Sequence, residues 1–193
     1  SNYDISYVDG SLAIDKAALT VTYAANRASS VYGAPRSAVS GTVSGTGFVN
    51  GESLADLGGG AGWSTAATAG AAAGRHAITG AGLTSGNYAI TARQAPGNAT
   101  AYRITPAALT ITAKDAAKTY DGTAFSGGNG IRVAGPVNGD TVASLAGRLR
   151  YGGSAQGATN AGSYRLAAGG LTSGNYTIAW APGTLTVGKA KLT

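Results

Sequence analysis

The stretch Leu83-Thr84-Ser85-Gly86-Asn87-Tyr88-Ala89-Ile90 returns 88 residues later as Leu171-Thr172-Ser173-Gly174-Asn175-Tyr176-Thr177-Ile178. Val49-Asn50-Gly51-Glu52 and Val137-Asn138-Gly139-Asp140 are separated by the same 88 residues. Separate matches at one offset indicate a duplicated unit. The unit is longer than solenoid or propeller repeats, which span roughly 20 to 50 residues, and long enough to form a small domain with its own core. A β-solenoid shaft is disfavoured by this period, although stacked coils in a structure would restore it.

Similar junctions divide the chain into repeats. Each contains a Leu-Thr pair, and the three lie at residues 14–20, 104–110 and 187–193. We therefore expect four parts: the C-terminal hairpin of a preceding repeat (1–17), repeat domain 1 (18–106), repeat domain 2 (107–188) and the start of the next repeat (189–193). The junctions leave little slack, so the domains are expected to form an elongated, semi-rigid rod.

Within each repeat the pattern predicts a mainly β fold. Residues 19–23 and 109–113 alternate in the manner of strands that are buried on one face. Residues 176–180 and 184–187 are predicted to form a hairpin through Ala181-Pro182-Gly183, and a similar hairpin is expected in residues 3–14.

Helical signal is weak. Residues 52–57 and 140–145 could each form one short turn, with an acidic residue at its N-terminal end. We therefore expect at most one short helix in each domain.

Composition excludes several classes of site. The 193 residues include 32 Gly and no Cys, which rules out disulfides, Cys-bound zinc and a thiol nucleophile. A single histidine, His76, rules out a multi-histidine metal site. No run approaches 18 apolar residues, so no membrane insertion is expected, and residues 1–10 lack the pattern of a signal peptide. The net charge of +6 comes from cations scattered along the sequence, which does not predict nucleic-acid binding.

Catalysis and cofactor binding are not predicted. A catalytic acid or base needs neighbours that hold it in place. At the repeat offset, Asp56 meets Ser144 and Asp115 meets Arg27, so the two repeats share no pair of acids. We expect no enzyme, no cofactor and no metal site.

Several short motifs carry a resemblance to a known family. Tyr120-Asp121-Gly122 and Tyr32-Gly33-Ala34 stand where that family has its YDG motif and its YGX variant. Gly170-Leu171, Asn175-Tyr176-Thr177-Ile178 and Gly183-Thr184-Leu185-Thr186-Val187 match its C-terminal pattern. The chain thus resembles the MBG and YDG repeat domains, which occur in tandem in large secreted bacterial haemagglutinin-like adhesins, the two-partner-secretion exoproteins. Repeat domain 1 is YGX-like and repeat domain 2 is YDG-like.

The resemblance implies a β-grasp-like module that is secreted or lies on the bacterial cell surface. It implies a non-catalytic stalk or fibre that projects an adhesive region, with neighbouring repeats of the same chain as partners. The alternative is that the repeats themselves bind a carbohydrate, such as an extracellular acidic polysaccharide or a host surface glycan, or a partner protein, in adhesion or biofilm formation.

The candidate site residues fall into two groups. The motif residues are interpreted as turn asparagines that bond local backbone, core tyrosines and aromatic anchors beside turns; they are Tyr32, Asn87, Tyr88, Tyr120, Asp121, Gly122, Asn175 and Tyr176. Arg148-Leu149-Arg150-Tyr151 is predicted to be a strand with both arginines on one face, which makes Arg148 and Arg150 the candidate ligand surface. Trp63, at the position of Tyr151, is expected to anchor the core.

Two asparagines fit the glycosylation sequon, and its use is an open question. They are Asn98 and Asn175.

Overall fold

The computed structural model describes residues 2–192 and consists mainly of β-strands, which confirms the predicted fold class. The first unit comprises β1 (Ala17–Ala25), β2 (Ala28–Val31), β3 (Gly41–Thr46), η1 (Leu54–Asp56), β4 (Gly58–Ser64), β5 (Gly74–His76), β6 (Thr79–Thr84), β7 (Tyr88–Gln94), η2 (Pro96–Thr100) and β8 (Tyr102–Thr105). The second unit comprises β9 (Ala107–Ala113), β10 (Ala116–Thr119), β11 (Ile131–Ala134), η3 (Val142–Ser144), β12 (Ala146–Gly152), β13 (Gly162–Thr172), β14 (Tyr176–Ala181) and β15 (Gly183–Gly188).

The strands form small sheets with the same pairing in both units. In the first unit the sheets run β3-β1-β7, β2-β8-β5 and β4-β6. In the second unit they run β11-β9-β14 and β10-β15-β13-β12, because β13 continues where the first unit breaks between β5 and β6. The central strands β1 and β9 pair in parallel with β7 and β14 and antiparallel with β3 and β11. These are separate sheets, all of them mixed except the antiparallel pair β4-β6, and not a stack of solenoid coils.

The chain changes sheets between β14 and β15. β14 pairs with β9, whereas β15 pairs with β13 and β10. The two strands do not pair with each other, so the predicted hairpin across residues 176–187 is wrong. Pro182 has no N–H to donate, and a Cβ at Gly183 would overlap the Ala113 carbonyl. The chain therefore passes close over the end of β9 and continues in the other sheet.

Residues 2–16 form neither helix nor strand, in contrast to the hairpin expected there. The corresponding segment of the second unit provides the reason, because β14 and β15 pair with β9, β10 and β13 and not with each other. Such a segment becomes a pair of strands only against the other strands of a unit. Residues 189–192 also form no strand, and residues 1 and 193 lie outside the described part of the chain.

The short helical turns follow the sequence closely. Ser53 caps η1 and Thr141 caps η3, each by accepting the N–H two residues later, and each turn carries a complete capping box. η2 is an addition to the expected elements. It is formed by the five residues that the first unit has in excess between its last two strands.

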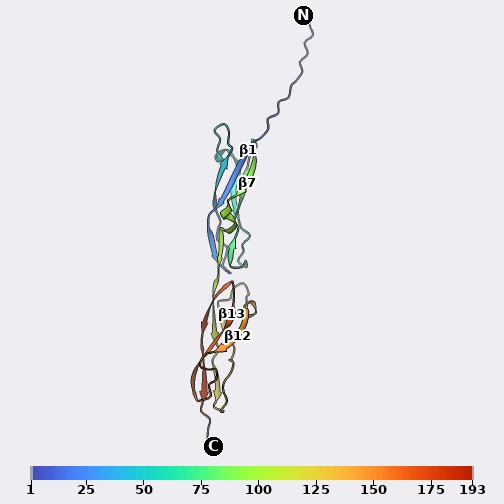
Figure 1. The fold of residues 1–193 in the computed structure, drawn as a ribbon. Coiled ribbons are helices and arrows are strands. Elements are labelled where there is room, and N and C mark those ends of the chain that lie inside the picture. The colour runs from blue at the N-terminus through green and yellow to red at the C-terminus, as the bar shows by residue number, and fades with distance from the viewer. Residues whose placement is uncertain (1, 193) are drawn as a thin grey trace.

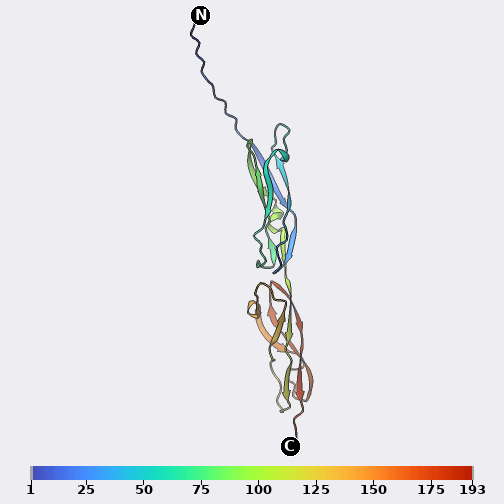
Figure 2. The same cartoon turned by 180° about the vertical axis from the view of Figure 1, so that it is seen from behind.

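The two units lie end to end, with β8 leading through Pro106 directly into β9 (Figure 1). The view from behind shows the same arrangement (Figure 2). Three clusters of buried side chains follow one another along the molecule. The middle cluster contains residues of both units, such as Tyr102 of the first and Leu109 of the second, so the core continues across their contact.

Candidate functional site at the contact between the units

A tight turn places two of the contact residues in the second unit. Asn138 and Gly139 both have positive φ, 55° and 76°, and the Asp140 N–H donates to the Val137 carbonyl at 2.9 Å. Two positive φ values are typical of a type I′ turn, and the Asn-Gly pair favours it. The turn holds Val137 and the Asp140 carboxylate at the end of the second unit.

The Tyr176 hydroxyl holds this turn in place through hydrogen bonds to both of its ends. Tyr176 begins β14, its ring is buried, and its hydroxyl accepts from the Val137 N–H at 3.0 Å and donates to Asp140 Oδ2 at 2.7 Å. Tyr88 has the same relation to the Asn50-Gly51 turn of the first unit, where its hydroxyl accepts from the Val49 N–H at 3.1 Å. The Asn-Tyr and Val-Asn-Gly motifs therefore repeat together because one holds the other.

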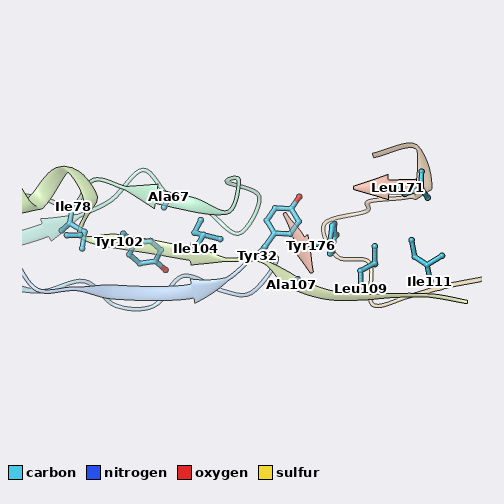
Figure 3. Packing of buried hydrophobic residues seen from close by; sticks show 11 residues of the cluster. Tyr32, Ala67, Ile78, Tyr102, Ile104, Ala107, Leu109, Ile111, Leu171 and Tyr176 are labelled. Carbon is cyan, nitrogen blue, oxygen red and sulfur yellow. The ribbon is translucent and has the colours of Figure 1, made fainter. Parts of the chain in front are cut away.

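Tyr32 of the first unit meets Tyr176 and Asp140 of the second. The two rings pack edge to face, with centroids 5.4 Å apart and an interplanar angle of 85°. The Tyr32 hydroxyl donates to the same Asp140 Oδ2 at 3.0 Å. One carboxylate oxygen thus accepts hydrogen bonds from tyrosines of both units, and Figure 3 shows both rings in the middle of the continuous core.

Backbone groups of the first unit make the remaining contacts with the second unit. Gly33 has a φ of 80°, and a Cβ there would overlap the side chain of Val137. The Ala69 carbonyl accepts from the Gly33 N–H and from the Asn138 amide, each at 3.0 Å. The Ala73 N–H donates to Asn175 Oδ1 at 2.9 Å. We call this contact, formed by Tyr32, Gly33, Ala69 and Ala73 with Val137, Asn138, Asp140, Asn175 and Tyr176, the joint.

The joint shifts the pKa values of its ionisable groups. The hydrogen bond from Tyr176, with a further one from Tyr32, holds the pKa of the Asp140 carboxyl below its ordinary value. Burial and the neighbouring Asp140 carboxylate raise the pKa of Tyr176. The Asp140 carboxylate and the Tyr176 hydroxyl thus stay in the protonation states that form their hydrogen bond at neutral pH.

Comparison with known families matches this duplicated architecture. The model of the MBG domain (YGX type) matches residues 19–106 and again residues 109–186. The chain belongs to the MBG domain family. The YGX-type model covers both units, including the second, where the motif reads Tyr120-Asp121-Gly122. No curated protein and no solved structure matches the chain.

The structure gives the MBG motif tyrosines two different environments. Tyr32 is 6 % exposed because the second MBG domain covers it, whereas Tyr120, at the same position of the second domain, is 45 % exposed. Both donate their backbone N–H to the last strand of their domain, to the Thr105 and Gly188 carbonyls. In both domains the motif tyrosine therefore lies beside the end of the last strand.

Asp121 plays a local part at the outer end of the second MBG domain. Its carboxylate accepts from Lys118 Nζ at 2.8 Å and from the Thr123 N–H at 2.9 Å, and these bonds lower the pKa of Asp121 far below its ordinary value. Gly122 beside it has a φ of 72° and nothing near its Cβ position. The conformation of this Tyr-Asp-Gly turn is thus stabilised by hydrogen bonds between residues that are close in sequence.

The end of the first MBG domain that lies away from the joint carries a surface like the one that the second domain contributes to the joint. A cavity of about 410 Å³ has Val49, Asn50, Glu52, Asn87 and Tyr88 in its lining. The Glu52 carboxylate raises the pKa of Tyr88 by hydrogen bonding to its hydroxyl. These residues correspond, 88 positions earlier, to those that receive Tyr32 in the joint.

Asn175 acts differently from the turn role that its sequence predicts. Its side chain bonds the backbone of the other MBG domain, and the Ser173 hydroxyl makes the local bond, accepting from the Asn175 N–H at 3.1 Å. In the first domain the Ser85 hydroxyl likewise accepts from the Asn87 and Tyr88 N–H groups. The asparagine is thereby left to contact a neighbouring domain.

Arg148 and Arg150 are exposed on β12, and Leu149 and Tyr151 between and after them are partly buried. Trp63 lies at the position of Tyr151 and packs edge to face on Tyr23. The structure does not bring Arg148 and Arg150 into the joint, and they do not line the cavity beside Tyr88. They remain the candidate ligand surface that the sequence predicts.

Asn98, which the sequence marks only as a sequon, is a buried structural residue. It is 3 % exposed. Its Oδ1 accepts from the Ala25 N–H at 2.8 Å, and its Nδ2 donates to the Tyr23 carbonyl at 2.9 Å and to Gln94 Oε1 at 2.8 Å. No local sequence signal distinguishes this role from that of an exposed asparagine, because the partners come from β1 and β7.

Residues 2–192 contain no group of three or more His, Cys, Asp or Glu side chains that could hold a metal ion. Within the same residues, no helix has the length and apolar character needed to cross a membrane.

Proposed function

We propose that this chain is a non-catalytic segment of the stalk or fibre of a secreted bacterial surface adhesin, where its MBG domains space an adhesive region from the cell. Membership of a repeat family of adhesin-like proteins supports the adhesin part of the proposal. The joint supports the stalk part, since Tyr32, Asp140 and Tyr176 tie two successive domains together through a shared core.

The same geometry supports neighbouring repeats as the partners of both ends. The Glu52 and Tyr88 surface would receive the Tyr-Gly turn of a preceding repeat, and Tyr120 would enter the corresponding surface of a following one. Every joint would then be formed by the same residue types, and the domains would follow one another at a fixed angle. Such an array would be extended and semi-rigid.

Small-angle scattering combined with residual dipolar couplings tests the stalk proposal. We expect an extended particle whose two domains share one alignment tensor. Tyr32→Ala should uncouple the tensors, because it removes the ring contact and one hydrogen bond to Asp140. Tyr120→Ala, the same change at the outer end, is the matched control and should leave the coupling intact. A compact wild-type particle, or domains that tumble independently, would contradict the proposal.

The location of the protein requires a separate experiment. Antibodies raised against the chain should label intact cells that produce the protein. Labelling that appears only after the cells are permeabilised would contradict a surface location.

A further inference from the structure

Three arginines that lie far apart in the sequence line one surface depression of the first MBG domain. Arg27, Arg75 and Arg103 surround a cavity of about 230 Å³, together with Ser29 and Thr100. All three arginines are exposed. We call them the arginine cluster.

Strand pairing forces two of these charges together. Arg75 of β5 and Arg103 of β8 are direct cross-strand partners, and Ser29 of β2 flanks Arg103 on its other side. Like charges placed directly opposite one another destabilise a sheet. Among residues 2–192, none of the three guanidinium groups forms an ion pair or a hydrogen bond with another side chain or with the backbone. The cluster therefore holds positive charge that the described protein does not neutralise.

The second MBG domain shows that the fold does not require this arrangement. Ser163 and Thr186 are the cross-strand partners at the register of Arg75 and Arg103. Asp115 stands at the position of Arg27, where its carboxylate accepts from the Thr184 N–H at 2.7 Å. Uncharged or acidic residues thus serve at the same three places of the same fold, and the cluster belongs to the first domain alone.

The distribution of acids increases the charge contrast. Residues 18–106 contain two acidic side chains, Glu52 and Asp56, and both lie in or beside η1. Arg75 and Arg103 lie on the β2-β8-β5 sheet instead, and Arg27 directly precedes β2. An anion at the cluster would meet three guanidinium groups and no carboxylate of its own domain.

The shape of the surface favours an extended ligand. A second depression, of about 360 Å³, shares Arg75 and Arg103 with the first and continues past Pro106 to Gly174 of the second domain. Guanidinium groups bind carboxylates and sulfates through paired hydrogen bonds. Two open depressions joined at two arginines suit a chain with acidic groups at intervals better than a single small ion.

The surface lacks the feature that single-stranded nucleic acids use. Proteins bind such strands by stacking bases on exposed aromatic rings. No aromatic side chain lines either depression, and Tyr102, the aromatic residue of β8, points inward and is 0 % exposed. An acidic polysaccharide, which needs charge and hydroxyl contacts, fits better.

We propose that Arg27, Arg75 and Arg103 form a binding site for a carboxylated or sulfated polysaccharide on the first MBG domain. The three arginines are distinct from Arg148 and Arg150 and from the residues of the joint, and the second depression reaches Ala73 at the edge of the joint. It gives the domain a binding function in addition to spacing, and it does not depend on the stalk proposal.

Titration calorimetry of the whole chain tests the site with three probes: polygalacturonate for carboxylate groups, dextran sulfate for sulfate groups and neutral dextran as the uncharged reference. We expect saturable binding of at least one acidic polymer, weakening as salt is added, and no binding of neutral dextran. The preferred acidic polymer identifies the acid group. No binding of either acidic polymer, or equal binding of neutral dextran, would overturn the proposal and leave the scattering test of the stalk unaffected.

The chain offers its own matched variants. Arg75→Ser with Arg103→Thr installs the residues that the second domain already carries at this register, and it should weaken binding about tenfold or more, since hydrogen bonds to charged groups are the strong ones. Lys189→Ala with Lys191→Ala removes the same charge at exposed residues outside the cluster and should change affinity by less than about threefold, because distant exposed charges are screened.

Equal losses in the two double variants would show binding to net charge alone and would overturn the site. Tighter binding of a single-stranded oligonucleotide than of either polysaccharide would also overturn it. Circular dichroism and the thermal midpoint should be preserved or raised in the Arg75→Ser, Arg103→Thr variant, because it removes a repulsive pair.

Discussion

At the scale of single residues, Asn98 shows how one side chain can replace strand pairing. β1 and β7 part where η2 is inserted, and the Asn98 amide bonds the Ala25 N–H, the Tyr23 carbonyl and Gln94 in their place. The backbone carbonyl of Asn98 also accepts from the Ile78 N–H at 2.9 Å. The burial of the amide indicates that this sequon is inaccessible in the folded domain.

Asn98→Ala should therefore destabilise the first domain strongly. It removes three hydrogen bonds and leaves the Ala25 N–H without its acceptor, which alone costs about 1–3 kcal/mol, so we expect a loss of about 2–4 kcal/mol in the free energy of unfolding. Urea denaturation followed by tyrosine and tryptophan fluorescence measures it. Asn87→Ala, at an exposed asparagine, serves as the control and should cost less than about 0.5 kcal/mol. Equal effects of the two changes would refute a structural role for Asn98.

Gly33 and Gly122 form a natural pair for testing the joint. Both have positive φ, so alanine costs about 1–2 kcal/mol at either position. Only at Gly33 would the new Cβ overlap a residue of the other domain, Val137. Gly33→Ala should therefore also disturb the joint, seen as chemical-shift changes at Val137 and Tyr176. Gly122→Ala should leave those signals in place, and similar shifts in both variants would contradict the contact.

At the scale of elements, the change of sheet between β14 and β15 depends on a close backbone approach. Gly183→Ala would bring a Cβ against the Ala113 carbonyl, and overpacking of this kind typically costs about 1–3 kcal/mol. Gly188→Ala, at the other end of β15, meets only the Lys118 carbonyl at 3.9 Å and is the control. Thermal unfolding of both variants compares them. A smaller loss at Gly183 than at Gly188 would contradict this role of the crossing.

The sequence predicts the elements better than it predicts their pairing. Alternation locates β1, β9, β14 and β15, and the capped turns η1 and η3 follow from short local motifs. Alternation carries no information on which strands are neighbours, because a strand and its partner share the same period. The hairpin across Pro182 is wrong for that reason: two adjacent strands joined by a short turn can also enter different sheets.

The sequence does not predict the joint or the arginine cluster either, because periodicity does not show which distant residues become neighbours. Tyr32 and Asp140 are 108 residues apart, and the repeat offset pairs each with its own copy and not with the other. Arg27, Arg75 and Arg103 are scattered in the sequence and become neighbours only through the register of β2, β8 and β5. Motif recurrence indicated that the residues matter without indicating what they touch.

At the scale of the whole molecule, the joint makes the relation between the domains dependent on pH. The two tyrosines lower the pKa of Asp140, so the ionised carboxylate stabilises the joint at pH values above the ordinary carboxyl pKa of about 4. That stabilisation is lost as the pH falls through the lowered pKa, because the protonated group accepts hydrogen bonds less well.

We therefore expect the two domains to lose their common alignment as the pH falls from 7 to below about 4, at pH values where each domain is still folded. Residual dipolar couplings recorded during the titration measure the change. Asp140→Asn should reduce the pH dependence, since its amide does not titrate in this range. An unchanged acid transition in Asp140→Asn would assign the effect to other carboxyl groups.

The parallel pairing of β1 with β7 and of β2 with β8 has a mechanical consequence. A pulling force along the molecule enters the first domain at Ala17 and leaves it at Thr105. It draws β1 one way and β7 with β8 the other, so the strands must slide past one another along their whole register. The hydrogen bonds are then loaded simultaneously and not broken one at a time, as in an opening zipper. Resistance to tension in this geometry is set by the unfolding rate and not by equilibrium stability.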